Sequence, residues 1–281
     1  MLVNEAIAFA EQELKRSNNL NSRLDSEILV SHLINIPRES IYSKLKENLP
    51  SNKTEELQKL VSRRVKKEPI AYILNNKEFW STNFYVDRSV LIPRPETEVL
   101  IDLILSQINN NNYLNILDIG TGSGCILVSL LKELTKAKGI GIDKSLKAIA
   151  VAKKNSTSQH VDSRSSFKNI NLENIKFDKK FDLIVSNPPY LPDVSLKNLN
   201  LDIKLYEPKI ALQGGVQGVD FLCKIITLAS KILKIKGLLA LEIGDNQFHI
   251  LAKYLKENRF KILDKYTLIN KQVRCLLATK L

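Results

Sequence analysis

The feature that most narrows the possible folds of this chain is a strand, a glycine-rich loop, a helix and a second strand in immediate succession. Tyr113 to Ile119 is an apolar run typical of a buried strand, and glycines follow it at positions 120, 122 and 124. Cys125 to Leu134 is an unbroken apolar helix with a late basic residue, and the short strand Gly139 to Ile142 ends at Asp143. This order is that of a βαβ unit, so we expect an α/β domain with a parallel sheet.

The loop and the acidic residue of this unit predict a nucleotide-type cofactor. An acidic side chain about twenty positions after a glycine loop can accept hydrogen bonds from two ribose hydroxyls, which gives Asp143 a role. Dinucleotide folds favour G-x-G-x-x-G, whereas Gly120-Thr121-Gly122-Ser123-Gly124 has the shorter G-x-G-x-G spacing and follows Asp118. A carboxylate there would repel a pyrophosphate but tolerates a cationic cofactor. The loop resembles the S-adenosylmethionine loop of class I methyltransferases, although alone it also fits an oxidoreductase.

A rigid polar corner follows a further predicted strand, Phe181 to Val185. Two consecutive prolines in Ser186-Asn187-Pro188-Pro189-Tyr190 end the strand, and the residue before a proline is restricted to extended geometry. Asn187 Oδ1 and the Pro188 carbonyl can then accept the two hydrogens of a planar nitrogen, with Tyr190 against its flat face. Such acceptors favour positive charge on the nitrogen and aim its lone pair at an electrophile. By itself, the segment also fits a plain turn that ends a core strand.

Further segments along nearly the whole chain carry a specific resemblance. They are Arg23 to Leu29, Arg63-Arg64, Glu68 to Ile73, Glu78-Phe79-Trp80, Leu91 to Glu98, Tyr206-Glu207-Pro208, Ala211-Leu212, Gly214-Gly215 and Gly218. Together with the glycine loop and the corner, they resemble the bacterial N5-glutamine methyltransferases that modify peptide chain release factors (the PrmC/HemK family).

The resemblance implies a site and a reaction. Gly120 to Gly124 would surround the methionine part of S-adenosylmethionine, and Asp143 would bind its ribose. Asn187 to Tyr190 would receive the glutamine of the Gly-Gly-Gln motif of class 1 release factors, and Asn187 would also touch the cofactor. The family commonly has an acidic residue and Trp near the adenine, where this chain has Asn171 and Leu172. The adenine contacts are therefore left open.

The chain of 281 residues, 44% hydrophobic, is expected to form two domains. Helical spacing of apolar residues predicts a helical, substrate-docking domain over residues 1–74, and a β-hairpin linker would occupy residues 75–95. That hairpin would run from Ala71 to Val86 with Asn75-Asn76 as its turn. Residues 96–281 would form a Rossmann-like methyltransferase domain, in which Phe260 to Leu263 pairs with Val273 to Leu277. The predicted fold class is thus α/β, a mostly parallel sheet with one antiparallel strand plus small N-terminal helices.

Charge and composition limit which partners and which location the protein can have. The net charge is +12, and the first 80 residues, with 13 basic and 11 acidic side chains, carry only +2 of it. A basic catalytic domain suits partners that touch RNA or the ribosome, but for most individual lysines we favour a scattered, solvated surface position. The scattered Cys and His residues predict neither disulfide nor metal site. Without a basic, apolar leader or an apolar run of roughly 18 residues, we expect a cytoplasmic protein that does not enter membranes.

Two other functions remain open on the sequence. The same Asn-Pro-Pro-aromatic corner would serve methylation of the exocyclic N6 nitrogen of adenine in DNA or RNA, because the edge of a flipped adenine resembles an amide. The helical N-terminal part and the Leu91 to Glu98 segment argue against that reading. A non-catalytic RNA- or ribosome-binding protein with a vestigial fold is the other alternative, and the intact loop, Asp143 and corner argue against it.

Overall fold

The computed structural model describes residues 1–108, 113–175, 177 and 180–281. The chain divides into two compact units. A helical unit comprises residues 1–75 and 200–206, and a sheet unit comprises residues 76–199 and 207–281. The chain therefore leaves the sheet unit once, after residue 199, and returns to it at residue 207.

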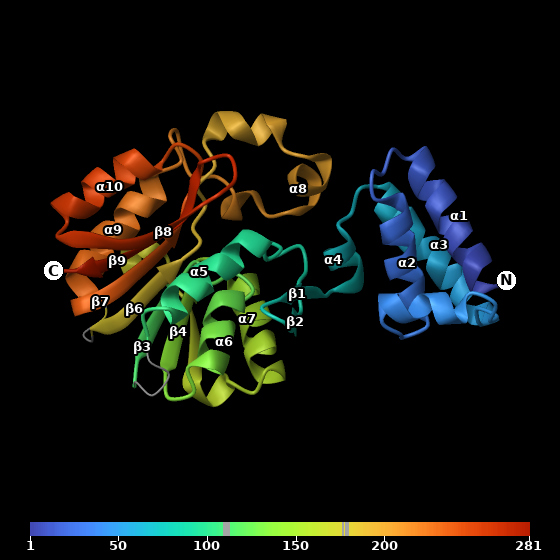
Figure 1. Ribbon diagram of the computed structural model, residues 1–281, viewed down its shortest axis with the longest axis horizontal. Helices are drawn as coiled ribbons and strands as arrows, with labels where there is room; N and C mark the ends of the chain where they lie inside the picture. The colour runs from blue at the N-terminus through green and yellow to red at the C-terminus, as the bar shows by residue number, and fades with distance from the viewer. Residues whose placement is uncertain (109–112, 176, 178–179) are drawn as a thin grey trace. The chain divides into compact units, whose positions relative to one another are not determined.

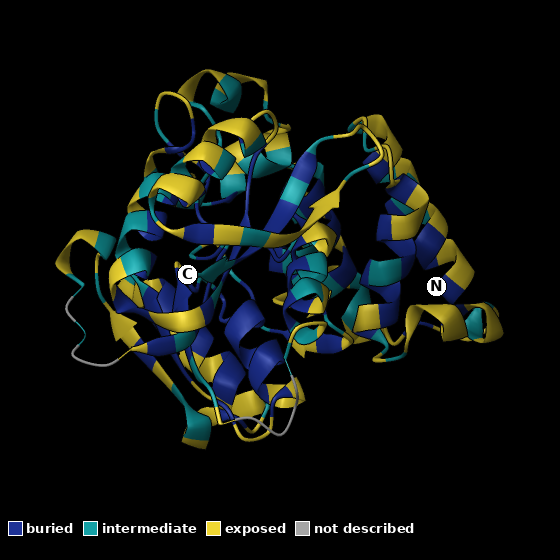
Figure 2. Cartoon of the chain, turned by 60° about the vertical axis from the view of Figure 1, so that its left-hand side comes forward, coloured by how far each residue is buried: buried dark blue, intermediate teal, exposed yellow. Residues whose placement is uncertain are grey.

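Short helices build the helical unit, and the longer ones among them bury one face. The elements are α1 (Val3–Arg16), α2 (Ser22–Leu33), η1 (Arg38–Lys44), α3 (Ser51–Val65), α4 (Ile70–Leu74) and α8 (Leu201–Tyr206). Ala6, Ala10 and Leu14 of α1 are buried, as are Leu57 and Val61 of α3, and Figure 2 shows the resulting stripes. The helical spacing of such apolar residues is what predicted helices in this part of the chain.

The short helix α8 is bound to the helical unit by polar contacts. Arg64 donates to Asp25 Oδ2 at 2.7 Å and to Asp202 Oδ2 at 2.8 Å, and the Arg64 side chain is only 10% exposed. The Tyr206 hydroxyl donates to the Lys66 carbonyl at 2.7 Å. Thus a segment that is far away in the sequence completes the packing of the N-terminal helices.

The sheet unit contains one seven-stranded sheet in the order β5-β4-β3-β6-β7-β9-β8 (Figure 1). Its strands are β3 (Asn115–Ile119), β4 (Lys138–Asp143), β5 (Ser165–Asn169), β6 (Phe181–Ser186), β7 (Leu233–Glu242), β8 (Phe260–Thr267) and β9 (Val273–Lys280). Neighbouring strands are parallel from β5 to β7, whereas β9 is antiparallel to both β7 and β8. The predicted fold class, with one antiparallel strand, is confirmed.

Helices cover both faces of this sheet (Figure 1). On one face lie α5 (Pro95–Leu105), α6 (Cys125–Glu133) and α7 (Leu146–Ser158), and on the other lie α9 (Asp220–Ile232) and α10 (Phe248–Glu257). In β3, Ile116 packs with the first set and Leu117 with the second. The central strands β3 and β6 are buried on both sides and read in the sequence as nearly continuous apolar runs, whereas the edge strands β5 and β8 are largely exposed and polar.

The predicted hairpin exists, but the predicted position of its turn is wrong. Its strands are β1 (Lys77–Phe79) and β2 (Thr82–Phe84), and the turn between them is Trp80-Ser81. Asn75 instead ends the helix α4, with φ of 51° and its N–H donating to the Ala71 carbonyl. An asparagine that tolerates the left-handed region can close a helix as well as make a turn, and here it closes the helix.

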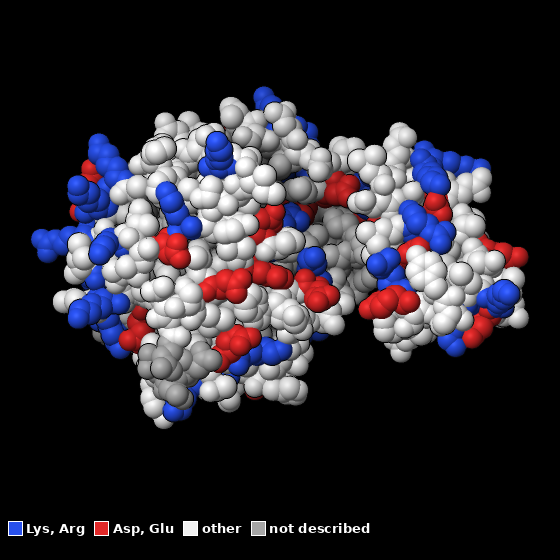
Figure 3. All heavy atoms as spheres, in the orientation of Figure 1, with Lys and Arg blue, Asp and Glu red and all other residues white. Residues whose placement is uncertain are grey.

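Basic side chains gather at one end of the sheet unit. On the face seen in Figure 3, Lys and Arg residues lie densely over the end that carries β7, β8, β9 and α10.

The described residues contain no helix long and apolar enough to cross a membrane. Among those same residues, no three His, Cys, Asp or Glu side chains are grouped so that they could hold a metal.

Candidate active site

An open cavity lies at the carboxyl ends of β3, β4 and β6, entirely within the sheet unit. Its empty space is about 1070 Å³, including the solvent at its mouth. The lining residues are Ser89, Val90, Leu91, Pro93, Thr97, Ile119 to Ser123, Cys125, Ile126, Ile142 to Ser145, Ala148, Ile170 to Leu172, Ser186 to Pro189, Pro208, Ile210, Ala211, Phe221 and Ile225. Eight of the ten site residues named from the sequence are in this wall, and Gly124 and Tyr190 are not.

The glycine loop turns sharply over the end of β4. The N–H groups of Gly120 and Thr121 both donate to the Ile142 carbonyl at 2.9 Å. Gly120 and Gly122 have φ of 73° and 53°, a region that side chains rarely adopt, although a Cβ at Gly120 would meet no atom within 4 Å. The backbone conformation therefore requires glycine, and the missing side chain leaves open space beside the loop. Gly124, at the start of α6, lies behind the loop and packs on Ala152 of α7.

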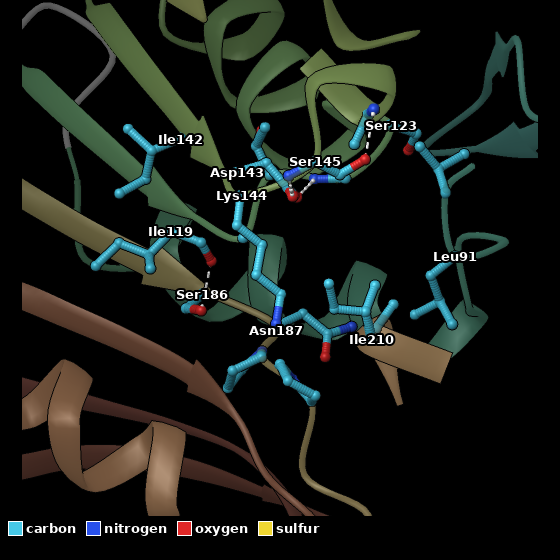
Figure 4. Close-up of a pocket in the computed structure, with 18 of the residues that line it drawn as sticks. Leu91, Ile119, Ser123, Ile142, Asp143, Lys144, Ser145, Ser186, Asn187 and Ile210 are labelled. Atoms are coloured by element: carbon cyan, nitrogen blue, oxygen red, sulfur yellow. Dashed lines mark hydrogen bonds between the residues drawn. The ribbon is translucent and has the colours of Figure 1, made fainter. Parts of the chain in front are cut away.

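Asp143 ends β4 with its carboxylate held against the loop. Its Oδ1 accepts from the Ser145 N–H at 2.8 Å and its Oδ2 accepts from the Gly122 N–H at 3.1 Å. Burial raises the pKa of Asp143, and the two backbone donors oppose that rise. Each carboxylate oxygen can accept a second hydrogen bond, so Asp143 can still bind two hydroxyls. Figure 4 shows Asp143 and Asn187 projecting toward the same cavity, with Lys144 extending between them.

Asp118 lies behind the loop, fully buried. Its Oδ2 accepts from the Thr121 hydroxyl at 2.6 Å, whereas its Oδ1 has no hydrogen-bond partner among the described residues. Burial, the largest cause, raises the pKa of Asp118 to about 7. Since Asp118 does not line the cavity, its observed role is to hold Thr121 and so the loop.

The corner after β6 is held by a chain of hydrogen bonds. Ser186 donates from its hydroxyl to the Ile119 carbonyl at 2.6 Å, which joins β6 to β3 (Figure 4). Asn187 Nδ2 donates to Thr97 Oγ1 at 3.1 Å, and the Thr97 hydroxyl donates to Glu242 Oε2 at 2.6 Å. The Tyr190 hydroxyl donates to the other oxygen, Oε1, at 2.9 Å. The corner is therefore bound to a carboxylate that the sequence analysis did not single out.

A second buried carboxylate organises the segment before α5. Glu207, whose side chain is 1% exposed, accepts from Arg94 at 2.5 Å and from the Ile92 N–H at 3.4 Å. These contacts tie the Leu91 to Glu98 segment to the chain at Pro208, and both contribute to the cavity wall.

Sequence reasoning did not identify the roles of Thr97 and Glu242, and it did not place Lys144 in the cavity wall. Glu242 carried a signal, since it is an isolated acidic residue at the end of the apolar run Leu238 to Leu241. Asn171 and Leu172 do line the cavity, and Asn171 accepts from the Glu173 N–H at 3.4 Å.

The sheet order, the single reversed strand β9 and the cavity beyond the strand ends define a class I methyltransferase. Solved structures share this fold. A methyltransferase from Pyrococcus furiosus superposes with a TM-score of 0.53 at 16% identity, covering 81% of this chain and 98% of that one. The 16S rRNA N2 G1207 methyltransferase RsmC of Thermus thermophilus gives 0.51 at 16% identity, covering 73% and 50%.

The chain belongs to the family of release factor glutamine methyltransferases. The family model of the PrmC N-terminal domain matches residues 5–74, and that of the methyltransferase small domain matches residues 97–264. A release factor glutamine methyltransferase of Clostridium acetobutylicum is 35% identical over 91% of this chain and 90% of its own length. One from Geobacter sulfurreducens is 39% identical over 81% and 78%. The family membership and the enzyme class predicted from the sequence are confirmed.

Some relatives are longer. The bifunctional methyltransferase of Rickettsia conorii is 37% identical over 87% of this chain, but the match covers only 51% of that protein. This chain thus spans about half the length of the Rickettsia relatives.

Proposed function

We propose that the protein transfers a methyl group from S-adenosylmethionine to the side-chain amide nitrogen, N5, of a glutamine in class 1 peptide chain release factors. The target glutamine would be that of their Gly-Gly-Gln motif. The observation that carries the proposal is the Asn187 carboxamide, which lines the cavity while its nitrogen is bound to Thr97. The names of the relatives point to the same substrate.

The cavity suits the proposed cofactor. Gly120 and Gly122 leave space beside the backbone for the methionine part, and the two Asp143 oxygens can accept from the ribose hydroxyls. Asn171 has a side-chain oxygen at the wall for the adenine amino group, and Ile170 and Leu172 offer apolar surface beside it. When bound, the cofactor supplies a methyl group on a positively charged sulfur.

The corner would act on the substrate amide. Asn187 Oδ1 and the Pro188 carbonyl would accept its two hydrogens, which holds the nitrogen in position and favours the positive charge that develops there. Pro188 and Pro189 keep these acceptors rigid. The contact of Tyr190 with the flat face of the amide stays a prediction from the sequence, because Tyr190 does not line the cavity. No general base is needed, because the methylated amide cation is very acidic and loses its proton after the transfer.

Methyl transfer can be followed directly. Purified protein, labelled S-adenosylmethionine, a release factor and bulk nucleic acid are incubated together, and peptide mass spectrometry locates the added mass. One methyl group on the Gly-Gly-Gln glutamine is the expected result. Label in nucleic acid with none in the release factor would favour the adenine N6 methyltransferase and overturn the proposed substrate.

Replacing Asn187 with Ala tests the corner. Loss of one positioned hydrogen-bonding group that acts in the transition state lowers kcat by about 10²- to 10³-fold. We expect a loss of that size in Asn187→Ala, with a smaller change in the Kd for S-adenosylmethionine measured by calorimetry. Turnover close to wild type would show that the side chain does not take this part.

A further inference from the structure

Glu242 is a buried carboxylate that the reaction as proposed above does not use. It is the last residue of β7, 1% exposed, and it accepts one hydroxyl on each oxygen, from Thr97 and from Tyr190. Burial raises the pKa of Glu242, while the two hydroxyls and the nearby Arg274 guanidinium oppose the rise. Burying such a group costs free energy that a neutral residue would not, so its placement next to the corner calls for a role.

The direction of the hydrogen bonds gives that role. A threonine hydroxyl has one hydrogen, and Thr97 donates it to Glu242 Oε2 at 2.6 Å. Toward Asn187, Thr97 can then only accept, so the NH₂ of the carboxamide must face it, as it does at 3.1 Å. The remaining atom, Asn187 Oδ1, takes part in no hydrogen bond among the described residues.

Shape alone would not choose this orientation. The oxygen and the NH₂ of a carboxamide are nearly equal in size, and a turned carboxamide would present hydrogens to the hydrogens of a substrate amide. Only the donor and acceptor pattern of the partner distinguishes the two arrangements. A single hydroxyl whose hydrogen is already committed is therefore sufficient to fix which atom faces the substrate.

The three groups come from three elements and meet at one edge of the sheet. Thr97 lies in the first turn of α5, and Asn187 follows β6 directly. Glu242 ends β7, where Ser186 pairs with Leu241 in the parallel register. Asn187 and Glu242 therefore leave neighbouring strands at the same level, and Thr97 bridges them.

We propose that Thr97, anchored by Glu242, is a positioning residue that keeps Asn187 Oδ1 turned toward the substrate amide. The inference rests on the proposed function, since it assigns the substrate-facing atom of Asn187. Tyr190, bound to the second oxygen of the same carboxylate, is fixed by the same anchor.

Variants of Thr97 separate this role from a structural one. Thr97→Val has a similar shape but no hydroxyl, so the carboxamide is free to turn, and we expect kcat to fall by tenfold or more. The KM for the release factor and the Kd for S-adenosylmethionine should change less than threefold. Thr97→Ser restores the hydroxyl and should recover most of the wild-type kcat.

Two further variants complete the test. Thr82→Val removes another buried threonine hydroxyl, in the hairpin strand β2, and should leave kcat unchanged. Glu242→Ala removes the anchor, and adding Thr97→Val to it should lower kcat little further, because the two residues act in series. If Glu242→Ala does not fold, the Thr97 variants decide.

The outcomes distinguish the two proposals. Wild-type protein that leaves a release factor unmethylated overturns the proposed function, and the positioning role with it. An active wild type with an equally active Thr97→Val overturns the positioning role alone. The positioning role is also overturned if the kcat of Thr97→Ser is as low as that of Thr97→Val, because the loss would then come from packing.

Discussion

At the scale of single residues, Asp118 shows how burial, with a smaller contribution from the nearby Asp143 charge, can make a carboxyl group sensitive to pH near neutrality. It has one hydroxyl partner, Thr121, and its second oxygen has none among the described residues. Its pKa rises from an ordinary 3.8 to about 7, so the folded protein keeps a proton that the unfolded chain has released.

The stability of the protein should respond accordingly. Because the folded-state pKa of Asp118 is the higher one, its contribution to the free energy of unfolding is complete below pH 4. It is lost at about 1.4 kcal/mol per pH unit as the pH rises toward about 7. Asp118→Asn cannot titrate, so its stability relative to wild type should rise between pH 5 and 7 and then level off.

Urea unfolding between pH 5 and 8, without cofactor, measures this difference. Asp162→Asn, which alters an exposed carboxylate, serves as the control and should keep a constant difference from wild type. If Asp118→Asn also differs from wild type by the same amount at every pH, Asp118 does not titrate in this range.

At the scale of elements, the β1–β2 hairpin has an unfavourable turn that neighbouring helices hold in place. Trp80 and Ser81 both have φ of 51°, a region that glycine and asparagine adopt more readily. The Trp80 N–H donates to Glu98 of α5 at 3.0 Å, and its indole N–H donates to Glu133 of α6 at 2.7 Å. Contacts with two helices thus compensate for a turn sequence that propensity disfavours.

Ser81→Gly should therefore stabilise the protein. Ser81 is exposed, and a left-handed conformation costs an L-residue about 1 kcal/mol more than it costs glycine. We expect a gain of about that size in the free energy of unfolding, measured by urea denaturation. Ser81→Ala, which keeps the Cβ, should change little, and an equal gain in both variants would show that the backbone is not the cause.

Whether the sequence could predict an element depends on whether the residues that determine it are neighbours in the chain. The strands β3, β4 and β6, the loop at Gly120 to Gly124 and the corner were predictable, because apolar runs and turn residues stand next to each other in the chain. The hairpin turn was misplaced because the deciding contacts of Trp80 involve Glu98 and Glu133. The link from Thr97 to Glu242 joins residues 145 positions apart, which no local pattern encodes.

At the scale of the whole molecule, a buried arginine links three helices of the helical unit. Arg64 holds both Asp25 from α2 and Asp202 from α8, with little exposure of either Arg64 or Asp25. Removing one partner of a buried ion pair leaves an uncompensated charge and typically costs about 3–5 kcal/mol.

Arg64→Leu should therefore destabilise the helical unit strongly. Lys59→Leu is the control on the same helix, because the Lys59–Glu55 pair is exposed to solvent and should contribute little to stability. Trp80, the only tryptophan, lies in the sheet unit, so its fluorescence reports that unit while circular dichroism reports helices in both. Arg64→Leu should shift the dichroism transition more than the fluorescence transition, and equal shifts would show that the units unfold together.

The position of α8 in the chain also sets an order of events during synthesis. Asp202 is added 138 residues after Arg64, which at about 5–20 residues per second is a delay of roughly 7–28 seconds. During that time the nascent N-terminal helices have Asp25 but not Asp202 as a partner for Arg64. The helices α1 to α3 therefore leave the ribosome well before α8 can complete their packing.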